Sequence, residues 1–169
     1  LGPAPANATP AAPHETLDLA SIVKAAHAIA ESSELDRLLE RLLRIAIENA
    51  GARRGLLIEE GDGALQIVAE GRSDDSPVAR LHGASVLEEP ARCCRAIVDY
   101  VWRTRASLVL DDAAQDERFA QDAYVTATHL KSVLCLPIVH QGDVSAILYL
   151  ENDLARDAFS PQRIELIQV

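Results

Sequence analysis

The segment that most constrains the fold is the stretch from Lys131 to Asn152, KSVLCLPIVHQGDVSAILYLEN. A two-residue pattern runs through Ser132–Val139 and again through Val144–Glu151, and β-branched and aromatic residues are enriched in both runs. Such a pattern is typical of β-strands with one covered face. The residues His140-Gln141-Gly142-Asp143 between the runs have the glycine expected of a tight turn. The sequence therefore predicts an antiparallel hairpin inside a larger sheet.

Helices and short strands are expected around this hairpin. Residues 1–15 are rich in alanine and proline and predict a linker or disordered arm, and residues 16–169 predict one domain. A helix over Glu34–Asn49 is expected to end at Gly51 and to bury an apolar stripe made of Leu35, Leu38, Leu39, Leu42 and Ala46. The other expected elements are a helix over Leu19–Ala30, strands over Arg54–Glu60, Ala64–Glu70, Leu81–Val86 and Ser107–Leu110, and helices that begin near Pro90, Glu117 and Pro161. The last helical pattern is unfinished at Val169, so we expect a truncated C-terminal helix.

The acidic character of the chain argues against two classes of partner. The formal net charge is -10 at pH 7, and lysines and arginines are interspersed with acids. Phosphate backbones and anionic membranes attract clustered basic residues, so neither nucleic acid nor a membrane is expected as a partner. No apolar run approaches the roughly 20 residues needed to span a bilayer, and the first residues lack the pattern of a signal peptide. The sequence therefore predicts a cytoplasmic domain.

Four phrases of the sequence resemble those of GAF domains, a family of small-molecule-sensing modules. They are Ile47–Ala52, Asp122–Tyr124, Lys131–Ile138 and Leu148–Asn152. They look most like the GAF domains of large bacterial sensor kinases that combine Ser/Thr-kinase-like, ATPase, GAF and histidine-kinase regions. The resemblance implies an α+β fold with a central antiparallel sheet of about five to six strands, helices on both faces and a pocket in front of the sheet.

Two known GAF ligands are disfavoured by residues near the hairpin. GAF domains that bind cyclic nucleotides usually carry an Asn-Lys pair after the last strand, whereas Asp153 follows Asn152 here. Phytochrome-type GAF domains attach a bilin through a cysteine on the helix before the Lys131 strand, and Arg118–Leu130 contains none. The cofactor is therefore unknown, with bilin and cyclic nucleotide disfavoured.

The cysteines define the redox candidates. Cys93 and Cys94 are expected at the start of a helix beside Arg92 and Arg95, where the helix dipole and the two cations favour a thiolate. The alternative interpretation is that Cys94 is a small core residue and Cys93 its neighbour. A few GAF proteins reduce free methionine sulfoxide with cysteines. In the resemblance, the attacking cysteine of those proteins falls at about Thr126, and a threonine cannot form a sulfenic acid. No catalytic residue and no metal site is expected.

Five residues are candidates for the ligand pocket that the resemblance implies. They are Asp112, Asp122, Tyr124, His129 and Cys135. Each also has a structural interpretation: the aspartates fit turn and cap positions, a lone histidine is usually hydrogen-bonded structure, and the tyrosine and the mid-strand cysteine fit a core.

Three functions remain from the sequence. The leading one is a non-catalytic, small-molecule-sensing GAF domain of a bacterial signalling protein, a sensor histidine kinase, with kinase domains flanking it and a second copy paired through the first and last helices. The second is a cysteine-based redox switch or an enzyme like methionine sulfoxide reductase. The third is a GAF domain used purely for dimerisation.

Overall fold

The computed structural model describes residues 37–38, 40–74, 78–86 and 91–165. The chain divides into two units, Leu1–Asp36 and Arg37–Val169, and all of the described residues belong to the second unit. The expected arm over residues 1–15, the helix over Leu19–Ala30 and the start of a helix at Pro90 lie outside the described residues.

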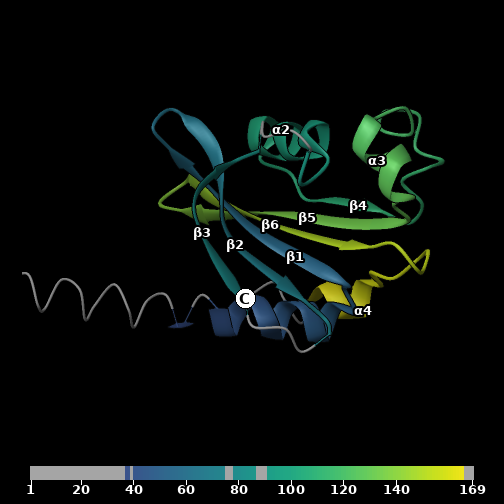
Figure 1. Ribbon diagram of the computed structural model, residues 1–169, viewed down its shortest axis with the longest axis horizontal. Helices are drawn as coiled ribbons and strands as arrows, with labels where there is room; N and C mark the ends of the chain where they lie inside the picture. Colours follow the sequence, from purple (N-terminus) through teal and green to yellow (C-terminus); the bar gives the residue numbers. More distant parts are fainter. Residues whose placement is uncertain (1–36, 39, 75–77, 87–90, 166–169) are drawn as a thin grey trace, which may run out of the picture. The chain divides into compact units, whose positions relative to one another are not determined.

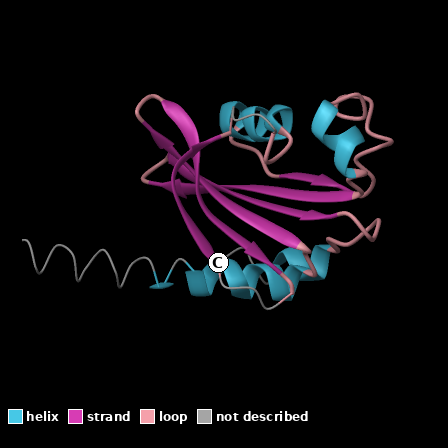
Figure 2. Ribbon diagram, in the orientation of Figure 1, coloured by secondary structure: helices cyan, strands magenta, loops and turns pink. Residues whose placement is uncertain are grey.

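A six-stranded sheet with the order β3-β2-β1-β6-β5-β4 forms the centre of this unit, and every pair of neighbouring strands is antiparallel. The expected α+β class, with helices on both faces of the sheet, is confirmed (Figure 2). The strands are β1 (Arg54–Gly61), β2 (Ala64–Arg72), β3 (Ala79–Ser85), β4 (Leu108–Leu110), β5 (Ser132–His140) and β6 (Asp143–Asn152).

Both predicted hairpins are present, and their turns explain why they form. Asp62 and Gly63 have φ values of 51° and 76°, and Gln141 and Gly142 have φ values of 52° and 89°. Positive φ at both central residues is the requirement of a type I′ turn, whose twist matches that of the flanking strands. The strands of the second hairpin, β5 and β6, pair from Ser132 with Asn152 to His140 with Asp143.

Helices cover the two faces of the sheet (Figures 1 and 2). On one face lie α2 (Arg95–Thr104) and α3 (Ala123–Thr128), and on the other lie a helix over residues 40–50 and α4 (Pro161–Glu165). The helix over residues 40–50 ends as expected at Gly51, whose φ is 72°, and the amide of Ala52 bonds to the carbonyl of Ile47. This is the bond pattern of a Schellman C-cap. The helix expected from about Glu117 begins later, because residues 117–121 form turns.

Each face of the sheet carries its own apolar core. The core beneath α2 and α3 contains Leu56, Ile97, Val101, Cys135 and Tyr149, among others. The core on the opposite face contains Leu43, Ile47, Leu134, Leu150 and Phe159, among others. The expectation of a strand with one covered face is therefore wrong for β6, which is buried without interruption from Ala146 to Asn152. Helices on both faces of the sheet are the physical reason.

The buried stripe of the helix over residues 40–50 also differs from the prediction. Leu43, Ala46, Ile47 and Ala50 are buried, whereas Leu38 and Leu42 are 53% and 51% exposed. Leu35 and Leu39 lie outside the described residues. This helix has two apolar stripes, and the sequence pattern alone does not decide which one faces the sheet. Within the described part of the chain, no helix is long and apolar enough to cross a membrane.

Candidate functional site

A buried charged cluster lies where β1 begins and where β2 and β6 end. Arg54 opens β1, and the sheet register places it between Arg72 of β2 and Glu151 of β6. Glu70 lies opposite Leu56, two pairs further along β1 and β2. The side chains of Arg54, Glu70 and Glu151 are only 11%, 12% and 10% exposed. The antiparallel register therefore brings together opposite charges that are far apart in the sequence.

Arg54 is the centre of the cluster. Its Nε donates to Glu70 Oε1 at 2.7 Å, and its Nη1 lies 3.0 Å from Glu151 Oε1. The same Nη1 lies 2.7 Å from the carbonyl oxygen of Arg92 and 2.9 Å from the hydroxyl of Tyr124. This one guanidinium thus binds two carboxylates of the sheet and reaches the segment before α2 and the helix α3. We call Arg54, Glu70, Arg92, Tyr124 and Glu151 the Arg54 network.

The other contacts of the Arg54 network satisfy both carboxylates. Arg92 Nη2 donates to Glu70 Oε2 at 2.6 Å, and Arg72 Nη2 lies 3.2 Å from Glu70 Oε1. The hydroxyl of Tyr124 lies 2.8 Å from Glu151 Oε1 and 3.0 Å from Oε2. Buried charges are tolerated only with such pairing and hydrogen bonding. Both buried carboxylates therefore have charged or hydrogen-bonding partners within the structure, and each of them depends on those partners.

The pKa values of the network follow from these contacts. Burial alone would raise the pKa of Glu70, but hydrogen bonding and charge from Arg54, and then from Arg92, outweigh burial and lower it to about 2. Burial opposes the charged form of Arg54 as well, yet Glu70 and Glu151 raise the pKa of its guanidinium. Burial and the Glu151 carboxylate raise the pKa of Tyr124, which keeps its phenol protonated as a donor. All three groups therefore hold their protonation states at neutral pH.

The network lies beside the connections between the sheet and the helices of the opposite face. Asn152 Nδ2, at the end of β6, donates to the carbonyl of Gly51 at 3.0 Å. Arg163 of α4 donates to the carbonyls of Ala50 and Ala158 at 3.4 Å and 2.9 Å. Asn152 also caps the turn that follows β6, because its Oδ1 accepts from the amides of Leu154 and Ala155. These bonds hold the helix over residues 40–50 and α4 to the same end of the sheet.

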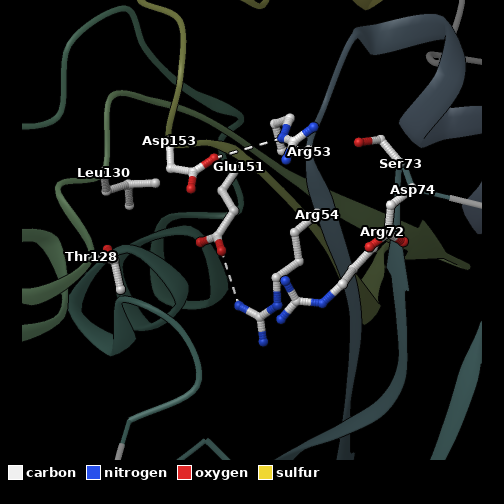
Figure 3. Close-up of a pocket in the computed structure, with 9 residues that line it drawn as sticks. All are labelled: Arg53, Arg54, Arg72, Ser73, Asp74, Thr128, Leu130, Glu151 and Asp153. Atoms are coloured by element: carbon white, nitrogen blue, oxygen red, sulfur yellow. Dashed lines mark hydrogen bonds and ion pairs between the residues drawn. The ribbon is translucent and has the colours of Figure 1, made fainter. Parts of the chain in front are cut away.

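An open cavity of about 90 Å³ lies against the Arg54 network (Figure 3). Its lining comes from the start of β1, the end of β2 and the residues after it, the end of α3 and the end of β6. The residues are Arg53, Arg54, Arg72, Ser73, Asp74, Thr128, Leu130, Glu151 and Asp153. In Figure 3, Glu151 points to Arg54, while Asp153 points to Arg53. Basic and acidic side chains thus share one small opening.

The structure brings only one of the five predicted pocket residues into this cluster. Tyr124 belongs to the Arg54 network through its hydroxyl. Asp122 caps α3, since its Oδ1 accepts from the amide of Tyr124 at 2.8 Å. Cys135 is fully buried in the core beneath α2. These three residues lie on the α2 and α3 side of the sheet, where apolar side chains form a core.

The other two predicted pocket residues lie elsewhere. Asp112 accepts from the amide of Ala114 and pairs with Arg156 at 2.6 Å, so it orders a turn. His129 is exposed at the C-terminus of α3, where its φ of 52° places it in the left-handed region. Among the described residues, no group of three or more histidine, cysteine or acidic side chains is arranged to hold a metal ion.

The thiols lie in the apolar core, as one of the two interpretations of the sequence expects. The α-helix begins at Arg95, and Cys93 and Cys94 precede it as buried members of the core beneath α2. Burial raises the pKa of each of these two thiols to about 12, and Asp122 contributes to the shift at Cys94. The structure therefore agrees with the interpretation of these cysteines as core residues, because desolvation outweighs the charge of Arg54 at Cys93 and the amides at the start of α2 at Cys94. Burial also raises the pKa of Cys135.

The sequence argument missed Arg54, Glu70, Arg92 and Glu151. A signal for two of them exists: Arg54 and Glu151 are the charged residues adjoining the apolar runs of their strands, at positions that an antiparallel register can pair. The positions of Glu70 and Arg92 depend on the β-bulge in the pairing of β1 with β2 and on the path of the segment before α2. No local pattern specifies either feature.

The arrangement defines an α+β domain built on one antiparallel sheet with helices on both faces. A model of the GAF domain matches residues 34–169, so the chain belongs to the GAF family. The GAF domain region of a Geobacter sulfurreducens protein superposes with a TM-score of 0.62 at 10% identity, covering 84% of this chain and 91% of that one. A type II free methionine-R-sulfoxide reductase from Thermoplasma acidophilum superposes with a TM-score of 0.55 at 12% identity, covering 78% and 82%. These likenesses concern the fold alone.

One curated relative is a signalling protein. The hybrid signal transduction histidine kinase G of Dictyostelium discoideum is 25% identical over 93% of this chain. The chain spans only 7% of the length of that relative. The match therefore relates this chain to GAF domains of histidine kinases, consistent with the predicted membership.

Proposed function

We propose that this chain is a non-catalytic, cytoplasmic regulatory domain of a sensor histidine kinase. A small molecule or a neighbouring domain displaces the segment before α2 or the helix α3, and the Arg54 network transmits this change to the helices on the opposite face of the sheet. The histidine kinase relative supports the signalling context. Flanking kinase domains would supply the output.

One observation carries this proposal. Arg54 binds Arg92 and Tyr124 on one side of the sheet, and it lies in the register row of Glu151, immediately before Asn152. Asn152 binds Gly51, at the end of the helix over residues 40–50. Polar contacts on each side, joined by the peptide bond between Glu151 and Asn152, thus connect the α2 and α3 side with the opposite helices. A change in one of these charged contacts would alter the relative stability of two arrangements of the connected helices, as a population shift requires.

The thiols support a regulatory rather than a catalytic role. A nucleophilic cysteine needs a low pKa and access to substrate. Cys93, Cys94 and Cys135 are buried, and the pKa of each is raised. This environment disfavours the thiol chemistry of the reductase whose fold this chain resembles.

The test is to remove one link of the Arg54 network without removing a charge. Tyr124→Phe deletes only the hydroxyl between Arg54 and Glu151. We expect faster amide hydrogen exchange in the helix over residues 40–50 and in α4, as well as in α3. Tyr100→Phe is the matched control, because Tyr100 packs edge-on against Phe119 and lies outside the network. Exchange that changes in α3 alone would refute the coupling.

A redox switch is the second candidate, and the grouping of the thiols favours it. Cys93, Cys94 and Cys135 are all buried in the same core, beneath α2 and α3. With hydrogen peroxide as oxidant, two thiols would be oxidised to one disulfide, and the peroxide would be reduced to two water molecules. Peroxide treatment followed by intact-mass and peptide analysis tests this. Thiols that stay reduced while the domain stays folded would end the redox candidate.

The predicted homodimer, paired through the first and last helices, remains a proposal, and an exposed face on a different helix suggests another surface for it. Leu38, Leu42 and Ile45 are 53%, 51% and 41% exposed and follow the spacing of a heptad seam. A second copy that packs on this face would cover all three side chains. Leu42→Glu should then shift the protein toward monomer in sedimentation, whereas Ile138→Glu, at another exposed apolar position, should not. A wild-type protein that is monomeric at high concentration would contradict the proposal.

A further inference from the structure

We propose that the cavity at the ends of β1, β2 and β6 binds a small zwitterion, such as an α-amino acid, through its carboxylate and its ammonium group together. The lining of this site is polar except for Leu130, unlike the apolar core beneath α2 and α3. The binding inference stands on the cavity itself. Only its consequence for signalling rests on the proposed regulatory role.

The floor of the cavity is already occupied by internal contacts. Arg54 donates to Glu70, Glu151, Tyr124 and the carbonyl of Arg92. Glu151 is bound by both Arg54 and Tyr124. These residues therefore provide a fixed, charged base rather than ligand-binding groups that are free to move.

Arg53, Asp153 and Arg72 are among the more exposed charged residues of the lining. Arg53 and Asp153 approach only to 3.9 Å, which is too long for a hydrogen bond, and both side chains are about half exposed. Arg72 is 56% exposed and touches Glu70 at 3.2 Å. The guanidinium groups of Arg53 and Arg72 have donors that these contacts do not use, since a guanidinium carries five N–H groups. A ligand can engage them without breaking the Arg54 network.

The balance of charge selects the class of ligand. Arg53, Arg54 and Arg72 line the cavity together with Asp74, Glu151 and Asp153. A simple anion would gain the arginines but meet three carboxylates, and a simple cation would meet three guanidinium groups. Figure 3 shows Glu151 and Asp153 on the side of β6 and Arg72 on the side of β2. A zwitterion can direct its carboxylate to Arg72 and Arg53 and its ammonium group to Asp153, so it satisfies both sides.

The size of the cavity sets a further limit. A volume of about 90 Å³ holds the charged core of an amino acid, and the opening to solvent leaves room for a short side chain. Because Arg72 also contacts Glu70, a bound carboxylate would compete for the guanidinium that completes the pairing of Glu70. A bound ligand would thereby change a contact of Glu70, which belongs to the Arg54 network.

The experiment compares one zwitterion with its two halves. The probes are L-alanine, propionate, which lacks the amine, and ethylammonium, which lacks the carboxylate. Binding is followed by backbone amide shifts in NMR titrations, because a ligand this small is expected to bind with a Kd of roughly 1 mM. We expect saturable shifts at residues 53, 72–74 and 153 with L-alanine, and at least about tenfold weaker binding of either half.

Variants of Arg72 and Asp153 and a matched control locate the binding. Arg72→Gln and Asp153→Asn should each weaken L-alanine binding by about tenfold. Arg105→Gln and Asp143→Asn are the controls, because Arg105, after α2, and Asp143, at the start of β6, form an exposed pair at 3.1 Å. They should leave binding unchanged.

Three outcomes would overturn the inference: no saturable binding of L-alanine, equal binding of either half, or binding that Arg72→Gln and Asp153→Asn do not weaken. These results are independent of the hydrogen-exchange test of the regulatory role. A domain that couples its two faces but does not bind L-alanine would contradict only the inference drawn here.

Discussion

Replacing Arg54 by methionine tests whether the Arg54 network behaves as one unit. Arg54→Met keeps an unbranched side chain but removes the donors to Glu70, Glu151, Tyr124 and the Arg92 carbonyl. Glu70 retains Arg92 and Arg72 as partners, whereas Glu151 retains the Tyr124 hydroxyl. The main damage is therefore a buried carboxylate at position 151 without a counter-ion.

Breaking a buried ion pair by removing one partner costs about 3–5 kcal/mol. We expect the lower end, about 3 kcal/mol, because Glu70 stays paired. In a domain of this size, that corresponds to a fall in Tm on the order of 10 °C. Arg105→Met removes an exposed pair with Asp143 and should change the free energy of unfolding by no more than about 0.5 kcal/mol. Urea unfolding followed by the fluorescence of Trp102, the single tryptophan, measures both variants.

A second substitution separates a stranded charge from lost packing. Arg54→Met/Glu151→Gln removes the carboxylate that Arg54→Met leaves unpaired, and a neutral amide can still bond to Tyr124. We expect the double variant to be more stable than Arg54→Met. If it is equally stable or less stable, the loss comes from packing, and the electrostatic explanation is wrong.

The pH dependence gives an independent check. The pKa of Glu70 is lowered from 4.5 to about 2 in the folded protein. A lowered folded-state pKa stabilises the fold above the unfolded-state value, and this stabilisation disappears as the pH falls toward the folded-state value. A shift of this size corresponds to about 3 kcal/mol, as an order of magnitude. Arg54→Met removes much of this lowering of the Glu70 pKa. The difference in free energy of unfolding between the variant and the wild-type protein should therefore become smaller as the pH falls below about 4.5. A difference in free energy of unfolding that stays the same at neutral and acidic pH would refute this reasoning.

Three further predictions concern single positions and the thiols. Gly55→Ala would place a Cβ atom 2.8 Å from Leu150 and 2.9 Å from Ile47, so we expect a loss of about 1–3 kcal/mol in urea unfolding; Gly63→Ala, which meets no neighbour but keeps a φ of 76°, should cost about 1 kcal/mol. Asp122→Ala removes the cap of α3 and should cost about 1 kcal/mol, with faster amide exchange at Tyr124 and Val125. The three cysteines should not react with a disulfide reagent at pH 7 in the folded protein and should all react in urea, because their raised pKa values come from burial.

The features that sequence patterns predict well here are local ones. The β5–β6 hairpin follows from its β-branched strands and the Gln141-Gly142 turn, and the end of the helix over residues 40–50 follows from Gly51. The choice between two apolar stripes on that helix is not local. Leu42 and Leu43 are neighbours with the same side chain, and only the position of the sheet decides that Leu43 is buried and Leu42 exposed.

The candidate site was harder to predict because it depends on register. Arg54 and Glu151 are separated by most of the domain in sequence and meet as partners in adjacent strands. Tyr124 was a candidate from the resemblance, but its partner was not apparent because α3 begins at Ala123, later than the sequence pattern indicates. The choice between the two interpretations of the thiols also depends on packing. The charges beside Cys93 and Cys94 were visible in the sequence, but the depth of burial that determines their pKa values was not.

The composition of the Arg54 network favours regulation over simple stabilisation. A well-packed apolar cluster at the same position would be about as stable as a buried ion pair, or more stable. Unlike an apolar cluster, however, Arg54, Glu70 and Glu151 respond to any charge brought near them. Arg54 and Glu151 form part of the lining of the cavity, so a ligand bound there would contact this network. The same end of the sheet holds Gly51 and Asn152, where the chain enters and leaves the sheet. A charge bound there would act on the contacts that connect the two faces, which is the arrangement that a ligand-sensitive coupling requires.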